Sequence, residues 1–268
     1  ITPPVGAFLA GYNPRKSLSI DHNLRAEAIA CEAERGSWIL ITADLLCFSM
    51  PLVRQVRQDI TARFGLKGET VFFAATHTHS GPLSHLGSWN EYPEEVLWFV
   101  ELRRKLADLA MQAWRNRAPG ILVHTITQAP GLACNRRRQK EDGTWTNVWM
   151  DKEGTSKGYY EPAVELVGVR RPGGDLDSLL VNYGCHPVCF GLNSMAISGD
   201  YVSYLKDALE SSGKVKTAQF TVAGHGNIDP RDCVQTDPAV TRKMGEDLAK
   251  VVLKALPDLL PVKGTMAG

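Results

Sequence analysis

Residues 70–82, TVFFAATHTHSGP, constrain this chain more than any other stretch. The first half is a continuous apolar run rich in β-branched and aromatic residues, which predicts a buried strand over residues 71–75. The second half changes at once to two histidines, three hydroxyl side chains and a Gly-Pro pair. Alternation along a strand would place His77 and His79 on the same side. Two neighbouring imidazoles at the end of a rigid strand indicate a metal or acid–base site.

The overall composition is that of an ordinary globular protein. Of the 268 residues, 44% are hydrophobic and 22% are charged, and the formal net charge is +1. These values give no indication of nucleic acid as a partner. No run of about 18 apolar residues is present, so no membrane span is expected. The six cysteines include no CxxC pair, and we expect small buried side chains rather than a disulfide framework.

The chain begins at Ile1 rather than at a methionine. We therefore expect that a leader, a tag or a flanking sequence has been removed. The compartment stays open on this evidence: a soluble protein that is cytoplasmic, or one exported after removal of its leader.

The first half of the chain alternates between the strand and helix periodicities. The segment that ends at Cys31 has an approximate alternation typical of a strand. A strand over residues 38–43, a helix over 51–64 and the strand over 71–75 predict a strand–helix–strand unit with parallel pairing. A long amphipathic helix over residues 94–115 and a strand over 121–128 follow.

The second half adds a hairpin, two further helices and a short strand. Apolar runs at residues 164–169 and 179–183, separated by the turn sequence PGGD, predict the hairpin. Residues 141–160 are polar and rich in glycine and tryptophan, which is typical of an irregular excursion or lid. The last predicted elements are a helix that opens at Asp200, a strand over 220–223 and a helix over 239–255. With no repeat or linker, we expect a single α/β domain over residues 1–268, a mixed β-sheet flanked by helices with its site at the strand ends.

Three predicted strand ends carry side chains that suit metal chemistry. His77 and His79 follow the first, His186 follows the second, and His225 with Asp229 follows the third. Two or three imidazoles with a carboxylate form the ligand set of a catalytic zinc site. Zinc lowers the pKa of a bound water to about 7 and so supplies a nucleophile at neutral pH.

Other polar residues allow two interpretations each. Asp44 follows a buried strand, so it either faces the site or caps the next helix. Asp200 serves equally well as a helix N-terminal charge. The run Arg136-Arg137-Arg138 is either a solvated surface or, beside a metal cleft, a clamp for a substrate oxyanion. The motifs HExxH, GxSxG, Walker A and GxGxxG are absent, which disfavours the commonest rival chemistries.

Several of these segments, in this order, resemble the neutral, non-lysosomal ceramidase family. The heptapeptide THTHSGP at residues 76–82 resembles the most recognisable motif of that family. Weaker similarities, in chain order, are NLRAEA, TADL, NRR, CHP, SGDY and GNIDP. The last of these occupies the place of a Gly-Asn-(apolar)-Ser-Pro segment in the family.

The resemblance implies a zinc-dependent metallohydrolase. His77 would be the first zinc ligand and His186 the second, and His79 with Arg136 or Arg137 would lie beside the scissile carbonyl. Two departures are plain. Asp229 stands where the family has its proposed catalytic serine, and the family takes a Glu and a Tyr ligand from a later part of a longer chain. We expect His225 as a further zinc ligand and Asp229 as a general base or a ligand. The remaining ligand could instead come from Asp200, from Asp44 or from a neighbouring subunit of a homo-oligomer.

The leading hypothesis is a hydrolase of an amide or ester bond that uses metal-activated water. Its substrate would be a small molecule or lipid-like, without specificity for ceramide. Two other hypotheses stay open on the sequence alone. One is a non-catalytic relative that binds a metal or ligand, and the other is a metal-dependent lyase or isomerase acting on a sugar or a hydroxy acid.

Overall fold

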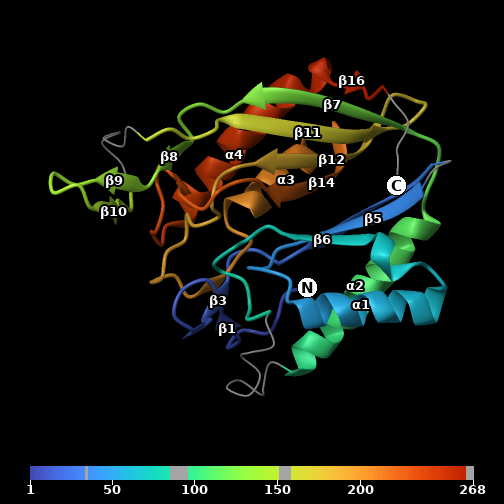
Figure 1. Cartoon of the computed structure of the whole chain (residues 1–268), viewed down its shortest axis with the longest axis horizontal. Helices are drawn as coiled ribbons and strands as arrows, with labels where there is room; N and C mark the ends of the chain where they lie inside the picture. The colour runs from blue at the N-terminus through green and yellow to red at the C-terminus, as the bar shows by residue number, and fades with distance from the viewer. Residues whose placement is uncertain (34–35, 85–95, 151–157, 264–268) are drawn as a thin grey trace.

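The computed structural model describes residues 1–33, 36–84, 96–150 and 158–263. Over these residues the chain has a mixed α/β fold, with helices packed against two larger sheets and with several additional short strand pairs (Figure 1). The fold class expected from the sequence is thereby confirmed. Within the same residues, no helix is long and apolar enough to cross a membrane.

The first sheet has the strand order β4 (Ala26–Ala33), β5 (Gly36–Ala43) and β6 (Val71–Ala75). β5 and β6 are parallel and helix α1 (Met50–Phe64) connects them, as the strand–helix–strand pattern predicts. α1 and α2 (Val96–Arg115) bury their apolar faces in one core with Ile39, Ile41 and Ala43 of β5. This packing supports the end of β6, from which His77 and His79 follow.

Helix α1 begins and ends where local chemistry requires. The hydroxyl of Ser49 accepts a hydrogen bond from the backbone N–H of Leu52, and Pro51 occupies the first turn. Gly65 ends the helix with a φ of 70°, a left-handed conformation that suits glycine. These caps fix the length of the crossover between β5 and β6.

The second sheet has the strand order β14 (Val215–Val222), β12 (Leu176–Tyr183), β11 (Ala163–Arg170), β7 (Ile121–Gln128) and β16 (Leu260–Pro261). β11 and β12 form the predicted antiparallel hairpin. β12 and β14 are parallel, with α3 (Tyr201–Ser211) between them along the chain. α3 and α4 (Pro238–Ala255) pack together on this sheet around a core that includes Leu205, Phe220 and Leu248. The pairing of Tyr183 with Val222 brings the two strand ends side by side.

Short strand pairs complete the fold. β8 (Ala133–Asn135) pairs antiparallel with β15 (Ile228–Pro230), and β9 (Arg137–Gln139) pairs with β10 (Trp145–Asn147) in a hairpin that projects at one end of the molecule (Figure 1). The sequence did not predict these pairs, because strands of three residues carry almost no periodicity. The remaining short strands and 3-10 turns are β1 (Phe8–Leu9), β2 (Arg15–Lys16), β3 (Ser19–Ile20), β13 (Ala196–Ile197), η1 (Gly68–Thr70) and η4 (Leu256–Asp258).

Several predicted boundaries differ from the observed ones. The last strand was expected at residues 220–223, whereas β14 starts five residues earlier, at Val215, where Lys216 and Thr217 hide its apolar pattern. The expected irregular excursion at residues 141–160 contains β10, and its residues 151–157 lie outside the described part. Residues 94 and 95 of the expected second helix also lie outside it. None of the six cysteines forms a disulfide, and Cys134, Cys185, Cys189 and Cys233 are buried, as expected for small core side chains.

Candidate metal centre

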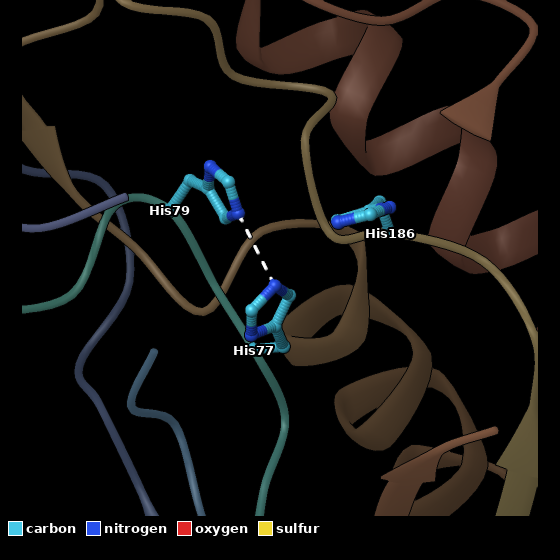
Figure 2. Close-up of side chains that lie close together, drawn as sticks. All are labelled: His77, His79 and His186. Atoms are coloured by element: carbon cyan, nitrogen blue, oxygen red, sulfur yellow. Dashed lines mark hydrogen bonds between the residues drawn. The ribbon is translucent and has the colours of Figure 1, made fainter. Parts of the chain in front are cut away.

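Four histidines meet where three strands end. His77 and His79 follow β6, His186 follows β12, and His225 follows β14. Figure 2 shows His77 and His79 on one segment and His186 on another, with the three rings directed toward a common space. The ring centroid of His225 lies 4.7 Å from that of His77 and 4.4 Å from that of His186. The structure therefore brings together all four histidines that the sequence singled out.

The backbone at His77 departs from the expected strand. β6 ends at Ala75, and His77 has a φ of 70°, a left-handed conformation that is uncommon for a residue other than glycine or asparagine. Its N–H donates to the carbonyl of Leu45 at 2.9 Å, and its Nδ1 lies 2.8 Å from the carbonyl oxygen of Leu46. Such strain persists only where the surroundings fix it, and it is concentrated at functional sites.

Carbonyl contacts set the proton position on three of the rings. A carbonyl oxygen only accepts, so the ring nitrogen facing it must carry the hydrogen. This places the hydrogen on Nδ1 of His77, on Nδ1 of His186 (3.3 Å from the oxygen of Ile228) and on Nδ1 of His225 (2.7 Å from the oxygen of Ala223). Each ring then has its lone pair on Nε2, the arrangement that fixes a metal-binding histidine.

His79 and His77 face each other through their ring nitrogens. Their Nε2 atoms are 3.5 Å apart, the contact drawn as a dashed line in Figure 2. Two nitrogen ligands on one tetrahedral zinc ion, each at about 2.0–2.1 Å, lie roughly 3.4 Å from each other. One nitrogen each from His77, His79 and His186 also lie within 4.8 Å of one another. These spacings fit a single cation.

Burial keeps these imidazoles neutral. It lowers the pKa of His79 to about 3, helped by the nearby His77 and His186. It also lowers the pKa of His186 to about 4, and it lowers the pKa of His77 below the usual range. At neutral pH their lone pairs are therefore available to a metal without competition from protons.

A carboxylate and a guanidinium lie against the imidazoles. Oδ1 of Asp229 is 3.5 Å from Nδ1 of His186 and 3.2 Å from Nη1 of Arg136. Arg136 also donates from Nη2 to the carbonyl of Gly226 at 2.7 Å, and its guanidinium lies 4.8 Å from the ring centre of Trp149. Burial raises the pKa of Asp229 to about 6, although Arg136 opposes the shift. The contact between Arg136 and Asp229 follows from the pairing of β8 with β15, which places Asn135 opposite Ile228.

Three polar atoms of this site have no hydrogen-bond partner among the described residues. They are Nδ1 of His79, Nε of Arg136 and Oδ2 of Asp229, and all three are buried. Buried polar atoms are nearly always satisfied, so a group of orphans in one place is typical of a site that binds something. With four imidazoles and one carboxylate beside them, the donor set fits zinc.

The structure separates the two arginines proposed for the site. Arg136 contacts Asp229, whereas Arg137 is exposed and lies 5.9 Å from the ring centre of Trp145 on the β9–β10 hairpin. Arg137 thus stands apart from the histidines. Arg136 lies between β8 and β9, where its backbone N–H donates to the carbonyl of Asn227, whereas Arg137 is the first residue of the β9–β10 hairpin.

The two further aspartates that the sequence left open lie in other environments. Asp44 is fully buried and pairs with Lys206 at 2.9 Å. Asp200 caps α3, accepting from the N–H groups of Cys189, Phe190 and Tyr201, and burial raises its pKa to about 6. Neither is among the residues that contact the imidazole rings.

Sequence reasoning missed the support behind His79. Tyr12 lies edge-on to the His79 ring at 4.9 Å between centroids, and Arg15 donates from Nη2 to the His79 carbonyl at 2.9 Å. Gly11 has a φ of 90°, and an added Cβ would lie 2.4 Å from Cγ of His79. Phe8 and Tyr12 stand in a turn-rich early segment, where an aromatic side chain predicts packing more readily than a pocket.

Two solved ceramidase structures share this fold. Neutral ceramidase from Pseudomonas aeruginosa matches with a TM-score of 0.73 and 18% identity over 93% of this chain and 42% of that chain. A structure of ceramidase complexed with C2 matches with a TM-score of 0.74 and 19% identity, over 93% of this chain and 41% of the other. No protein-family model and no curated protein matches the sequence. The chain thus has a neutral ceramidase-like fold and spans less than half the length of these proteins, so the resemblance expected from THTHSGP is confirmed for the fold.

Proposed function

We propose that this chain is a zinc-dependent hydrolase that cleaves an amide or ester bond in a small or lipid-like substrate. One observation carries the proposal. Three imidazoles, each held by a backbone carbonyl with its lone pair on Nε2, lie beside three buried polar atoms that have no partner among the described residues. The ceramidase-like fold supports the same reaction class, because a ceramidase hydrolyses an amide. We propose His77, His186 and His225 as the ligands, since each presents a lone pair on Nε2. His79 is the alternative third ligand, because ring nitrogens of His77, His79 and His186 lie within 4.8 Å of one another.

The remaining residues would carry the reaction. A zinc ion held by the imidazoles supplies Lewis acidity that polarises a carbonyl and lowers the pKa of water. Asp229 has Oδ2 free to take a proton from the attacking water, while Arg136 holds its Oδ1. The water oxygen then bonds to the carbonyl carbon, the C–N or C–O bond breaks, and Asp229 returns the proton to the leaving group.

The negative charge that develops on the carbonyl oxygen of the substrate needs a hydrogen-bond donor. Nε of Arg136 is buried and has no partner in the described part of the chain, so it is one candidate. His79 is the other, because it lies beside His77 and contributes a ring whose Nδ1 is also unpartnered. We propose that Asp229, Arg136 and His79 act on the substrate, and we assign no contact to the exposed Arg137.

A metal-reconstitution assay tests the proposal. The protein is offered a panel of N-acyl amines and esters with increasing acyl length, before and after treatment with a zinc chelator. We expect hydrolysis that is lost on chelation, restored by zinc and absent in His77→Ala. His124→Ala, which alters a histidine on β7, is the matched control and should retain activity.

Other outcomes would change the assignment. Full hydrolysis by metal-stripped protein would contradict the proposal. Stoichiometric zinc without turnover across the panel would favour a non-catalytic relative. If His79→Ala loses zinc while His225→Ala retains it, these two histidines exchange the roles proposed above.

A further inference from the structure

A second polar cluster is buried between α3 and the first sheet. Nζ of Lys206 lies 2.9 Å from both carboxylate oxygens of Asp44 and 3.1 Å from Oε1 of Glu27. Lys206 and Asp44 are 0% exposed and Glu27 is 5% exposed. Lysine is almost never fully buried unless it is paired, so this cluster calls for a reason.

The charges in the cluster depend on one another. Burial alone would lower the pKa of Lys206, but Asp44 and Glu27 outweigh it and raise the pKa above its usual range. Arg25 adds a second cation, with Nε 2.9 Å from Oε1 of Glu27, and its backbone N–H donates to Asp44 at 2.9 Å. Removing Lys206 would leave two buried carboxylates, of which Glu27 still pairs with the Arg25 guanidinium, and Arg25 is also paired with Glu210.

The cluster is joined to His77 through two residues. Asp44 directly precedes Leu45 and Leu46, whose carbonyls receive the N–H and the Nδ1–H of His77. These two contacts fix both the left-handed backbone of His77 and the tautomer that exposes Nε2. The position of the turn over residues 44–46 therefore decides where the metal-binding nitrogen lies.

Tight packing holds the Asp44 carboxylate in place. An added Cβ at Gly199 would lie 3.1 Å from Cγ of Asp44, and one at Gly81 would lie 3.3 Å from its backbone oxygen. Both distances are shorter than an ordinary van der Waals contact, so a larger residue at either position would push against Asp44. Asp44 is thus held by Lys206 from α3, by Arg25 from the segment before β4, and by two glycine segments.

We infer that the buried Lys206–Asp44 pair is a positioning device that holds the turn at residues 44–46 so that His77 presents Nε2 to the metal. This inference rests on the proposed function. Lys206 touches none of the four histidines in any contact described above, so it acts through Asp44, Leu45 and Leu46. Groups that hydrogen-bond directly to a metal ligand, as the Leu46 carbonyl does to His77, typically change metal affinity about 10–100-fold when they are displaced.

Zinc affinity of the folded protein tests the inference. Dissociation constants are measured by competition with a chromophoric chelator for wild type, Lys206→Met and Asp44→Asn. We expect zinc binding about 10–100-fold weaker in Lys206→Met, and weakened to a smaller degree in Asp44→Asn, which keeps the shape of the side chain. Leu209→Ala is the control, because Leu209 is buried on the same helix and its loss lowers stability without touching the pair.

A second readout needs no metal. Nitrogen NMR of labelled histidine in the metal-free protein reports the tautomer of His77, which should be Nδ1–H in wild type and mixed in Lys206→Met. If the wild type binds no zinc, the proposed function fails. The His77 tautomer in the wild type and in Lys206→Met still tests this inference. Should Lys206→Met not fold, Asp44→Asn decides it. Zinc affinity and tautomer equal to wild type in a folded variant would overturn the inference.

Discussion

Two buried polar clusters lie on either side of the turn at residues 44–46, and they differ in how their groups are satisfied. In the cluster around Lys206, every charged side-chain nitrogen and oxygen has a partner, while Nε2 of the neighbouring Gln219 lacks one among the described residues. In the histidine cluster, Nδ1 of His79, Nε of Arg136 and Oδ2 of Asp229 have no hydrogen-bond partner within residues 1–33, 36–84, 96–150 and 158–263. A satisfied cluster indicates a structural role, whereas orphaned groups at strand ends indicate a place where a ligand completes the contacts.

The first prediction removes the carboxylate of the histidine cluster. Asp229→Asn should lower kcat about 10²–10⁴-fold, because an amide cannot take the proton from water. Zinc content should stay near that of wild type, since the three proposed histidine ligands remain. Asp232→Asn, an exposed neighbour, is the matched control and should retain activity. Equal kcat values for the two variants would remove Asp229 from the mechanism.

The second prediction concerns the stability of the satisfied cluster. Lys206→Met should lower the free energy of unfolding by about 3–5 kcal/mol, because it leaves Asp44 and Glu27 buried without Lys206. Denaturant titration of the metal-free protein measures the change. Lys216→Met is the control, because Lys216 pairs with Asp177 at the surface, and exposed pairs contribute only about 0–1 kcal/mol. A similar small change in both variants would contradict the contrast between the clusters.

The third prediction separates two neighbouring arginines. Arg136→Ala should lower kcat about 10²-fold or more, as expected when a donor to a developing oxyanion is lost. Arg137→Ala should leave kcat almost unchanged, since this side chain lies over Trp145 on the hairpin. Steady-state kinetics on the best substrate of the panel measures both. A larger loss from Arg137→Ala would mean that the hairpin folds over the site during the reaction.

The fourth prediction is a titration of the metal-free protein. Proton NMR should show His186 and His79 neutral at about pH 5, because burial lowers their pKa values to about 4 and about 3. His22 is the internal control: its hydrogen bond to Asp21 raises its pKa, so it should already be charged. The unfolded chain takes up protons at His79 and His186 below about pH 6.5, whereas the folded chain does so only near their lowered pKa values. These two groups therefore reduce the free energy of unfolding as pH falls through that window.

Part of the site could be predicted because its signal is local. The strand over residues 71–75 with its two following histidines is a contiguous motif, and His186 and His225 also sit just after apolar runs. Parallel pairing of β12 with β14 brings the ends before His186 and His225 together, and β14 also contacts β6, which His77 and His79 follow. The expected strand alternation over His77 and His79 is wrong, because β6 ends at Ala75 and His77 has a left-handed φ; the two rings meet through this backbone geometry instead.

The rest of the site and the Lys206 cluster depend on contacts between residues that are far apart in the sequence. Arg136 and Asp229 are 93 positions apart and meet through three-residue strands, which have no periodic pattern of their own. Lys206 lies on an amphipathic helix, where a lysine predicts an exposed position, and its partner Asp44 is 162 positions away. The sequence left Asp44 open between the site and a helix cap, and the buried pair with Lys206 is neither. Tertiary packing decides such pairs, so a single sequence does not reveal them.

Elemental analysis of metal in the purified protein tests the central claim most directly. Wild type, His77→Ala, His186→Ala and the control His124→Ala are compared after reloading with zinc and removal of excess. We predict one zinc per chain in wild type and in His124→Ala, and loss of zinc in the two site variants. A wild-type protein that cannot be loaded, or zinc that persists in both site variants, would contradict the account.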